Sequence, residues 1–110
     1  MRQEDHLQYN IVRRFSYESP QHYGRLSEVN NNPSNRNHAM KRRAMGMISG
    51  VSDLILIGKG GIICGIELKS DSGTQSKQQK EWQGIVERLG GKYICSRNEN
   101  EVWKFITDNI

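Results

Sequence analysis

The stretch at residues 50–73, "GVSDLILIGKGGIICGIELKSDSG", decides the fold. Two apolar runs, 53–57 and 62–69, flank a glycine-rich turn at 58–61, and this pattern predicts a β-hairpin. Three charged residues interrupt the apolar runs, namely Asp53, Glu67 and Lys69. Because Asp, Glu and Lys are depleted in strands, their presence here requires a chemical explanation.

Strand geometry places the three charges together. Residues two apart point to the same face of a strand, so Glu67 and Lys69 project on one side. A turn at 58–61 brings Asp53 opposite the end of the second strand, near Lys69. Two carboxylates held close together repel unless a cation lies between them, and oxygen ligands suit Mg²⁺ or Mn²⁺. We therefore expect a metal site on Asp53 and Glu67, to which the backbone carbonyl of Leu68 adds a ligand.

A lysine beside such a metal has a chemical task. Lys69 is placed to orient or deprotonate an attacking water, or to stabilise charge on a phosphorane-like transition state. The pattern thus predicts phosphodiester hydrolysis. An alternative stays open on these residues alone: Asp53 caps the start of a strand, while Glu67 and Lys69 form a solvated ion pair on a polar sheet face.

The N-terminal segment predicts a helix over residues 3–16. Glu4, Leu7, Ile11 and Phe15 fall at spacings of three, four and four residues, which places them on one stripe. Glu4 therefore shares the core-facing side, and a buried glutamate favours a cation partner. A long polar connection follows, rich in Asn and Pro, in which we expect a short strand near 26–29 and a short basic helix ending at Gly46.

A second long helix is predicted to begin at Ser76. Ser76 as N-cap and Gln79 three residues later form a capping box, a role that needs no catalytic purpose for Gln79. The apolar face of this helix is expected to comprise Trp82, Ile85, Val86 and Leu89, with an end at the glycines 90 and 91.

A third apolar β run at 92–96 and an amphipathic helix over 99–110 close the chain. The fold class is α/β, a small mixed sheet flanked by helices in the order α-β-β-α-β-α. We expect one domain over residues 1–110. The two cysteines, Cys64 and Cys95, lie in apolar runs and are expected to be reduced core thiols.

The net charge of +4 is unevenly distributed. Residues 1–50 carry eight Lys and Arg against four acidic residues, whereas residues 51–110 carry eight of each. The cluster Lys41, Arg42 and Arg43 would suit contacts with a phosphate backbone, and a solvated helix face is the equally open alternative.

The residues from "GVSDLIL" through "GIELKSDSGTQSKQQKEWQGIVERLGGKYIC" resemble the VRR-NUC (virus-type replication-repair nuclease) domain of the PD-(D/E)xK nuclease superfamily. The shared features are Gly-Val-x-Asp-Leu, Gly-Ile-Glu-x-Lys, Ser-x-x-Gln-Lys-x-Trp and Gly-Gly-x-Tyr, in this order over residues 46–97. One departure is Ser52, where the family often has proline. This change is expected to affect the start of the strand more than the chemistry.

The resemblance implies a restriction-endonuclease-like core with Asp53 and Glu67 as metal ligands and Lys69 as the catalytic lysine. It implies that Glu4 supports the metal directly or through water, and that Gln79 lines the active site.

Proteins made only of this domain resemble phage and prophage nucleases that act as homodimers, so the resemblance implies branched DNA such as four-way (Holliday) junctions as substrate. Replication, recombination or repair in the cytoplasm of a bacterial host is the expected setting. A different class of function also fits the sequence, a non-catalytic nucleic-acid-binding module that keeps the nuclease-like fold.

Overall fold

The structure is a computed structural model that describes residues 1–30 and 35–110. The helices in these residues are α1 (Gln3–Glu18), α2 (Arg36–Ala44), α3 (Lys77–Arg88) and α4 (Glu99–Asn109). The strands are β1 (Leu26–Glu28), β2 (Leu54–Ile57), β3 (Ile63–Leu68) and β4 (Lys92–Ser96), with single 3₁₀ turns η1 (Pro20–His22) and η2 (Lys59–Gly61).

The predicted hairpin is confirmed as β2 and β3. The two strands pair antiparallel with Leu54 opposite Ile66, and the turn between them contains Gly60 and Gly61 at φ of 75° and 81°. Such left-handed backbone favours glycine, which explains the composition of the turn. β4 adds to β3 in parallel, and β1 adds to β2 antiparallel, so the strand order is β1-β2-β3-β4.

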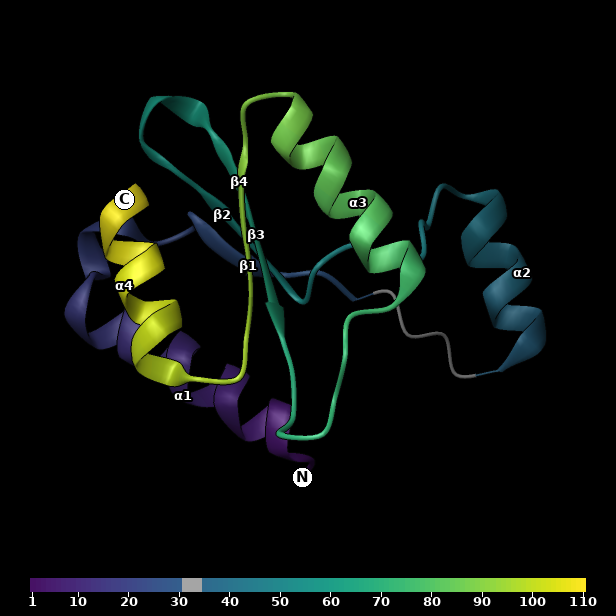
Figure 1. Ribbon diagram of the computed structural model, residues 1–110, viewed down its shortest axis with the longest axis horizontal. Helices are drawn as coiled ribbons and strands as arrows, with labels where there is room; N and C mark the ends of the chain where they lie inside the picture. Colours follow the sequence, from purple (N-terminus) through teal and green to yellow (C-terminus); the bar gives the residue numbers. More distant parts are fainter. Residues whose placement is uncertain (31–34) are drawn as a thin grey trace.

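The two faces of this sheet are covered by different helices (Figure 1). α1 and α4 lie on one face, where the side chains of α1, the sheet and α4 form one buried cluster that includes Ile11, Leu54, Ile66 and Ile106. α3 lies over the opposite face of β3 and β4. Because side chains alternate along β3, Leu68 joins the buried cluster while Glu67 projects on the α3 face. The expected architecture of a mixed sheet flanked by helices is therefore confirmed.

The six elements of the expected order are present, and so are the two short elements expected in the long connection. The short strand predicted near 26–29 is β1, and the short basic helix predicted before Gly46 is α2. The Asn-rich part of this connection, residues 31–34, lies outside the described residues. Both predicted long helices are confirmed, and Ser76 and Gln79 form the predicted capping box.

Two predictions about burial are wrong in part. Val86 is buried and Trp82 is half-buried, but Ile85 is 45 % exposed and Leu89 is 84 % exposed. Ile85 and Leu89 line a hollow between α3 and the hairpin turn at 60–63 instead of packing into the core. Cys64 is a buried free thiol as predicted, whereas Cys95 is a free thiol on the surface. Cys95 pairs with Glu67 in the parallel register and so lies on the less covered α3 face.

Within the described residues, no helix combines the length and apolar composition that crossing a membrane requires.

Candidate active site

The hairpin register places Asp53 opposite Glu67. Asp53 immediately precedes β2, whose first residue, Leu54, faces Ile66 on β3. The Asp53 Oδ2 atom accepts a hydrogen bond of 2.8 Å from the backbone N–H of Leu68. This bond fixes the carboxylate across the strand pair. Ser52 is fully buried and donates its hydroxyl to the Leu54 carbonyl, so its contact is local.

Glu67 is a buried carboxylate, and one of its two oxygen atoms lacks a hydrogen-bond partner among the described residues. The residue is only 3 % exposed, and this oxygen is Oε1. Desolvation by burial and, second, the neighbouring Asp53 carboxylate raise the pKa of Glu67 to about 8, against a partial lowering by Lys69. A buried acceptor without a partner carries a desolvation cost, which a bound cation would remove.

Lys69 completes the predicted group of three charged residues, Asp53, Glu67 and Lys69, which we call the trio. Its Nζ atom lies 3.6 Å from Glu67 Oε2 and donates a hydrogen bond of 2.8 Å to Gln79 Oε1. The Lys69 side chain is 15 % exposed. The ammonium group is therefore held at a fixed place beside the two carboxylates, and the solvated-pair alternative does not describe it.

Gln79 performs the capping role and contacts Lys69 with the same oxygen. Gln79 Oε1 accepts from the Ser76 backbone N–H at 2.8 Å as well as from Lys69 Nζ. Both partners can only donate, so the orientation of the amide is determined. The N-terminal turn of α3 thus positions the lysine through the same glutamine that completes the cap.

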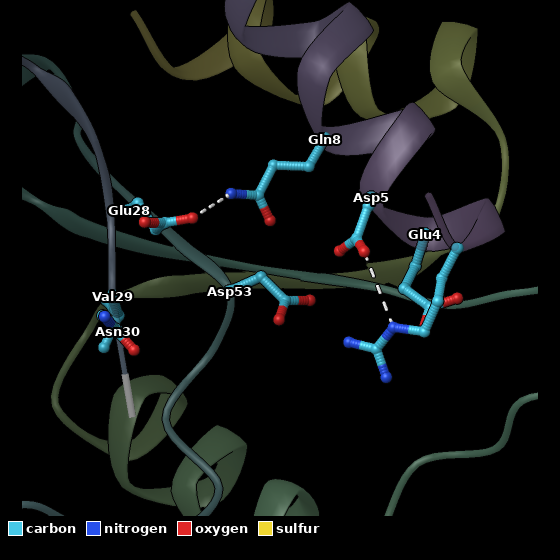
Figure 2. A pocket seen from close by; sticks show the side chains of 8 residues that line it. Glu4, Asp5, Gln8, Glu28, Val29, Asn30 and Asp53 are labelled. Carbon is cyan, nitrogen blue, oxygen red and sulfur yellow. Dashed lines mark hydrogen bonds and ion pairs between the residues drawn. The ribbon is translucent and has the colours of Figure 1, made fainter. Parts of the chain in front are cut away.

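A cavity of about 200 Å³ opens beside Asp53 on the α1 side of the hairpin. Figure 2 shows Glu4 and Asp5 projecting from α1 toward it, with Asp53 across from them. Glu4 Oε1 lies 3.4 Å from Arg2 Nε, and the Glu4 side chain is 29 % exposed. The structure therefore brings Glu4 to the margin of the site, in an ion pair.

Glu28 lines the same cavity and was not found from the sequence. It ends β1, where it pairs with Leu54, and its Oε2 atom accepts a hydrogen bond of 2.8 Å from Gln8 Nε2 (Figure 2). A three-residue strand without a motif gives little sequence signal, although the expected strand at 26–29 included the residue.

Tyr93 is a second residue that sequence reasoning missed. It projects on the α3 face like Glu67, accepts a 3.1 Å hydrogen bond from Gln75, and burial raises its phenol pKa well above the usual range. The alternation of β4 offered the signal that could have found it.

Lys41, Arg42 and Arg43 do not join the trio. They lie in the last turn of α2, all three exposed, and form no ion pair with any described residue. The basic cluster is therefore a separate surface.

The donor set of the trio fits a hard divalent cation in part. Asp53 and Glu67 offer carboxylate oxygens, and the unpartnered Glu67 Oε1 is the observation that favours a cation. In residues 1–30 and 35–110, no three His, Cys, Asp or Glu side chains lie close enough together to hold a metal ion. The remaining ligands would have to be backbone or water oxygens.

Comparison with known proteins gives a match at the level of the fold. Neither a family model nor a curated protein matches the sequence. A solved structure described as "VRR_NUC domain protein" superposes with a TM-score of 0.81 at 20 % identity, over all of this chain and 89 % of that one.

The chain has the VRR-NUC fold. The resemblance seen in residues 46–97 therefore extends to the whole described architecture, and the expected nuclease-like core is confirmed. At this identity the likeness establishes the fold, and the activity rests on the site itself.

Proposed function

We propose that this protein is a metal-dependent DNA endonuclease that hydrolyses phosphodiester bonds in branched DNA. The observation that carries the proposal is the buried Glu67 carboxylate, held beside Asp53 and within 3.6 Å of Lys69 on a VRR-NUC fold. A solvated surface pair would not need this burial. The arrangement suits an attack on a phosphate, where negative charge grows in the transition state.

The residues of the chain divide the chemistry between them. Asp53 and Glu67 would hold Mg²⁺ or Mn²⁺, with the Leu68 carbonyl and Glu4, directly or through water, as further ligands. When bound, such an ion supplies positive charge that polarises a phosphoryl oxygen.

Lys69 orients the attacking water and stabilises the charge that develops on the phosphate oxygens. The water oxygen forms a bond to phosphorus as one phosphorus–oxygen ester bond breaks. This step leaves a phosphate monoester on one strand end and a hydroxyl on the other. Gln79 keeps Lys69 in place throughout.

Outside the trio, Lys41, Arg42 and Arg43 hold the phosphate backbone of the substrate. Because one such site cuts one strand, paired incisions across a four-way junction need two copies, and we include a homodimer in the proposal. A phage or prophage enzyme acting in replication, recombination or repair in the cytoplasm of a bacterial host is the setting that this substrate suggests.

The test is cleavage of labelled four-way junction, flap, single-stranded and plain duplex DNA with Mg²⁺, Mn²⁺ or EDTA. Asp53→Asn keeps an oxygen that can accept from the Leu68 N–H, and Lys69→Met keeps the length of the side chain. Each should lower cleavage by about 10³-fold or more, since each removes a charge that acts on the transition state. Affinity for DNA should stay within about twofold, because both groups are engaged inside the protein.

Matched controls are Asp108→Asn and Lys104→Met, which make the same changes in an exposed ion pair on α4. Both should cut like the unaltered protein. Cleavage that survives Asp53→Asn and Lys69→Met would refute the assignment of the reaction to this site, and cleavage that persists in EDTA would refute its metal dependence. Binding without any cleavage by the unaltered protein would favour the non-catalytic binding module.

A further inference from the structure

α2 is a helix with little packing. Within Arg36–Ala44 only Ala39 is buried, and Figure 1 shows α2 standing apart from the sheet, beyond α3. The helix is nevertheless well terminated. The Asn35 side chain accepts from the His38 N–H, and Gly46 follows the end of the helix at a φ of 106°. A helix that is specified by its caps and contributes little to the core has a use outside the core. We call residues 35–48 the α2 arm.

The charge of the arm suits a polyanion. No acidic residue occurs between Glu28 and Asp53, while four cations lie within nine residues: Arg36, Lys41, Arg42 and Arg43. Phosphates gain from several exposed cations on one short element.

The arm also exposes large apolar side chains between these cations. Met40 is 61 % exposed, Met45 is 66 % exposed, and Ile48 is 59 % exposed. Helical spacing places Met40 beside Arg36 and Arg43, and Met45 beside Lys41 and Arg42. Methionines contribute nothing to phosphate binding, so their exposure within a basic cluster points to a ligand that offers both charge and apolar surface.

Gly50, two residues after the arm, lies against the first turn of α3. It has a φ of +93° and passes so close to this turn that a Cβ there would collide with the Gln78 backbone. That turn carries Gln79, which holds Lys69. The segment that follows the arm therefore contacts the turn of α3 that positions Lys69.

We propose that the α2 arm recognises the branch point of DNA, with its cations on phosphates and with Met40 and Met45 stacked on bases that the branch exposes. The inference rests on the proposed function and names the feature of the substrate that the site would select. In continuous duplex the base faces are covered by stacking, whereas at a junction apolar side chains can reach them.

An anionic membrane surface is the other ligand that offers both negative charge and apolar surface. Helices that lie on membranes separate their cations and apolar residues onto opposite faces. In α2 the two kinds of residue alternate around the helix, which favours nucleic acid.

The experiment measures binding in EDTA, so it does not depend on catalysis. A four-way junction carries 2-aminopurine at the branch, and a duplex carries it in the same sequence. The unaltered protein should raise the fluorescence of the junction by unstacking the base, and should prefer junction to duplex. Met40→Gln with Met45→Gln should abolish the rise and lower the preference about tenfold, the scale of one lost base contact. Duplex affinity should stay within about twofold, because the cations are retained.

Two further variants test whether the effect depends on apolar side chains in the arm. Met40→Leu with Met45→Leu should behave as the unaltered protein, since apolarity is preserved. Leu89→Gln makes the same kind of change at the exposed end of α3 and should have no effect on either DNA.

An unchanged fluorescence rise and preference in the glutamine variant would overturn the inference, and so would an equal loss on junction and duplex. Tighter binding to phosphatidylserine vesicles than to junction DNA would replace nucleic acid by a membrane as the ligand. A normal binding result together with no cleavage in Mg²⁺ or Mn²⁺ would refute the proposed nuclease alone.

Discussion

The charged side chains of the hairpin site are shielded from solvent, whereas those of the α2 arm are exposed to it. Glu67 is 3 % exposed, the Lys69 side chain is 15 % exposed, and each lies within reach of a fixed neighbour. Lys41, Arg42 and Arg43 are exposed and form no ion pair with any described residue.

The difference separates two kinds of work. Charges that are removed from water interact strongly and keep a fixed geometry, as a reaction requires. Charges that stay in water interact weakly and sensitively to salt, as reversible contact with a long polyanion requires. Substitutions in the hairpin should therefore change stability and rate, whereas those in the arm should change affinity.

The largest effect on stability is expected from Glu67→Gln. The folded pKa of Glu67 is about 8 and its ordinary value is 4.5, so the folded state holds the proton more tightly. Below about pH 4.5 the carboxyl is protonated in both states, and its contribution to stability is fully present. That contribution falls as the pH rises from about 4.5 to 8, and above pH 8 it is lost. Without metal at pH 8, the free energy of unfolding of the Glu67→Gln variant should be higher than that of the unaltered protein by on the order of 2–4 kcal/mol.

Urea unfolding at pH 5, 6.5 and 8 in EDTA measures this difference. Glu87→Gln, at an exposed position on α3, is the control and should follow the unaltered protein at each pH. Mg²⁺ or Mn²⁺ should restore stability at pH 8 only where Glu67 is present, because bound cations stabilise the folded state. Parallel pH curves for Glu67→Gln and the unaltered protein would contradict the burial argument for the metal.

The next effect comes from Gln79, which joins the α3 cap to the lysine. Gln79→Met removes the acceptor for Lys69 and half of the capping box. Misplacement of the lysine should lower kcat about 10- to 100-fold with little change in affinity for DNA, and stability should fall by about 1 kcal/mol.

Ser76→Ala separates the two roles of Gln79. It removes the hydroxyl that accepts from the Gln79 N–H and leaves the Ser76 backbone donor and the Gln79 to Lys69 bond in place. It should lose about 1 kcal/mol of stability and keep kcat within about threefold. Equal loss of kcat in both variants would mean that only the cap matters.

The elements that the sequence predicts well depend on local rules. The glycine turn after Gly58 and the capping box at Ser76 each act within a few residues, and both are present as predicted. The convergence of Asp53, Glu67 and Lys69 also follows from register alone, because a hairpin with a known turn has one pairing.

The features that sequence reasoning missed depend on how distant elements pack. Which face of the sheet a helix covers decides whether Cys95 is buried, and the alternation of β4 does not contain that information. The bond between Gln79 and Lys69 requires the position of α3 over the sheet. Glu28 reaches the cavity because β1 pairs with β2 across a long connection, which no local pattern indicates.

The smallest effect on the catalytic rate should come from the arm, in the triple variant Lys41→Gln, Arg42→Gln and Arg43→Gln. If all three cations touch phosphates, the slope of log K for DNA binding against the logarithm of the salt concentration should become less negative by about 2.7. The affinity for DNA near physiological salt should fall about tenfold or more. At saturating DNA, kcat should stay within about twofold, because the hairpin site is untouched. Lys59→Gln with Lys92→Gln, at exposed positions near the other end of the hairpin, should leave the salt slope nearly as it is. An unchanged slope and affinity in the triple variant would make the cluster a solvated face, and would also remove the phosphate contacts on which branch recognition by the α2 arm depends.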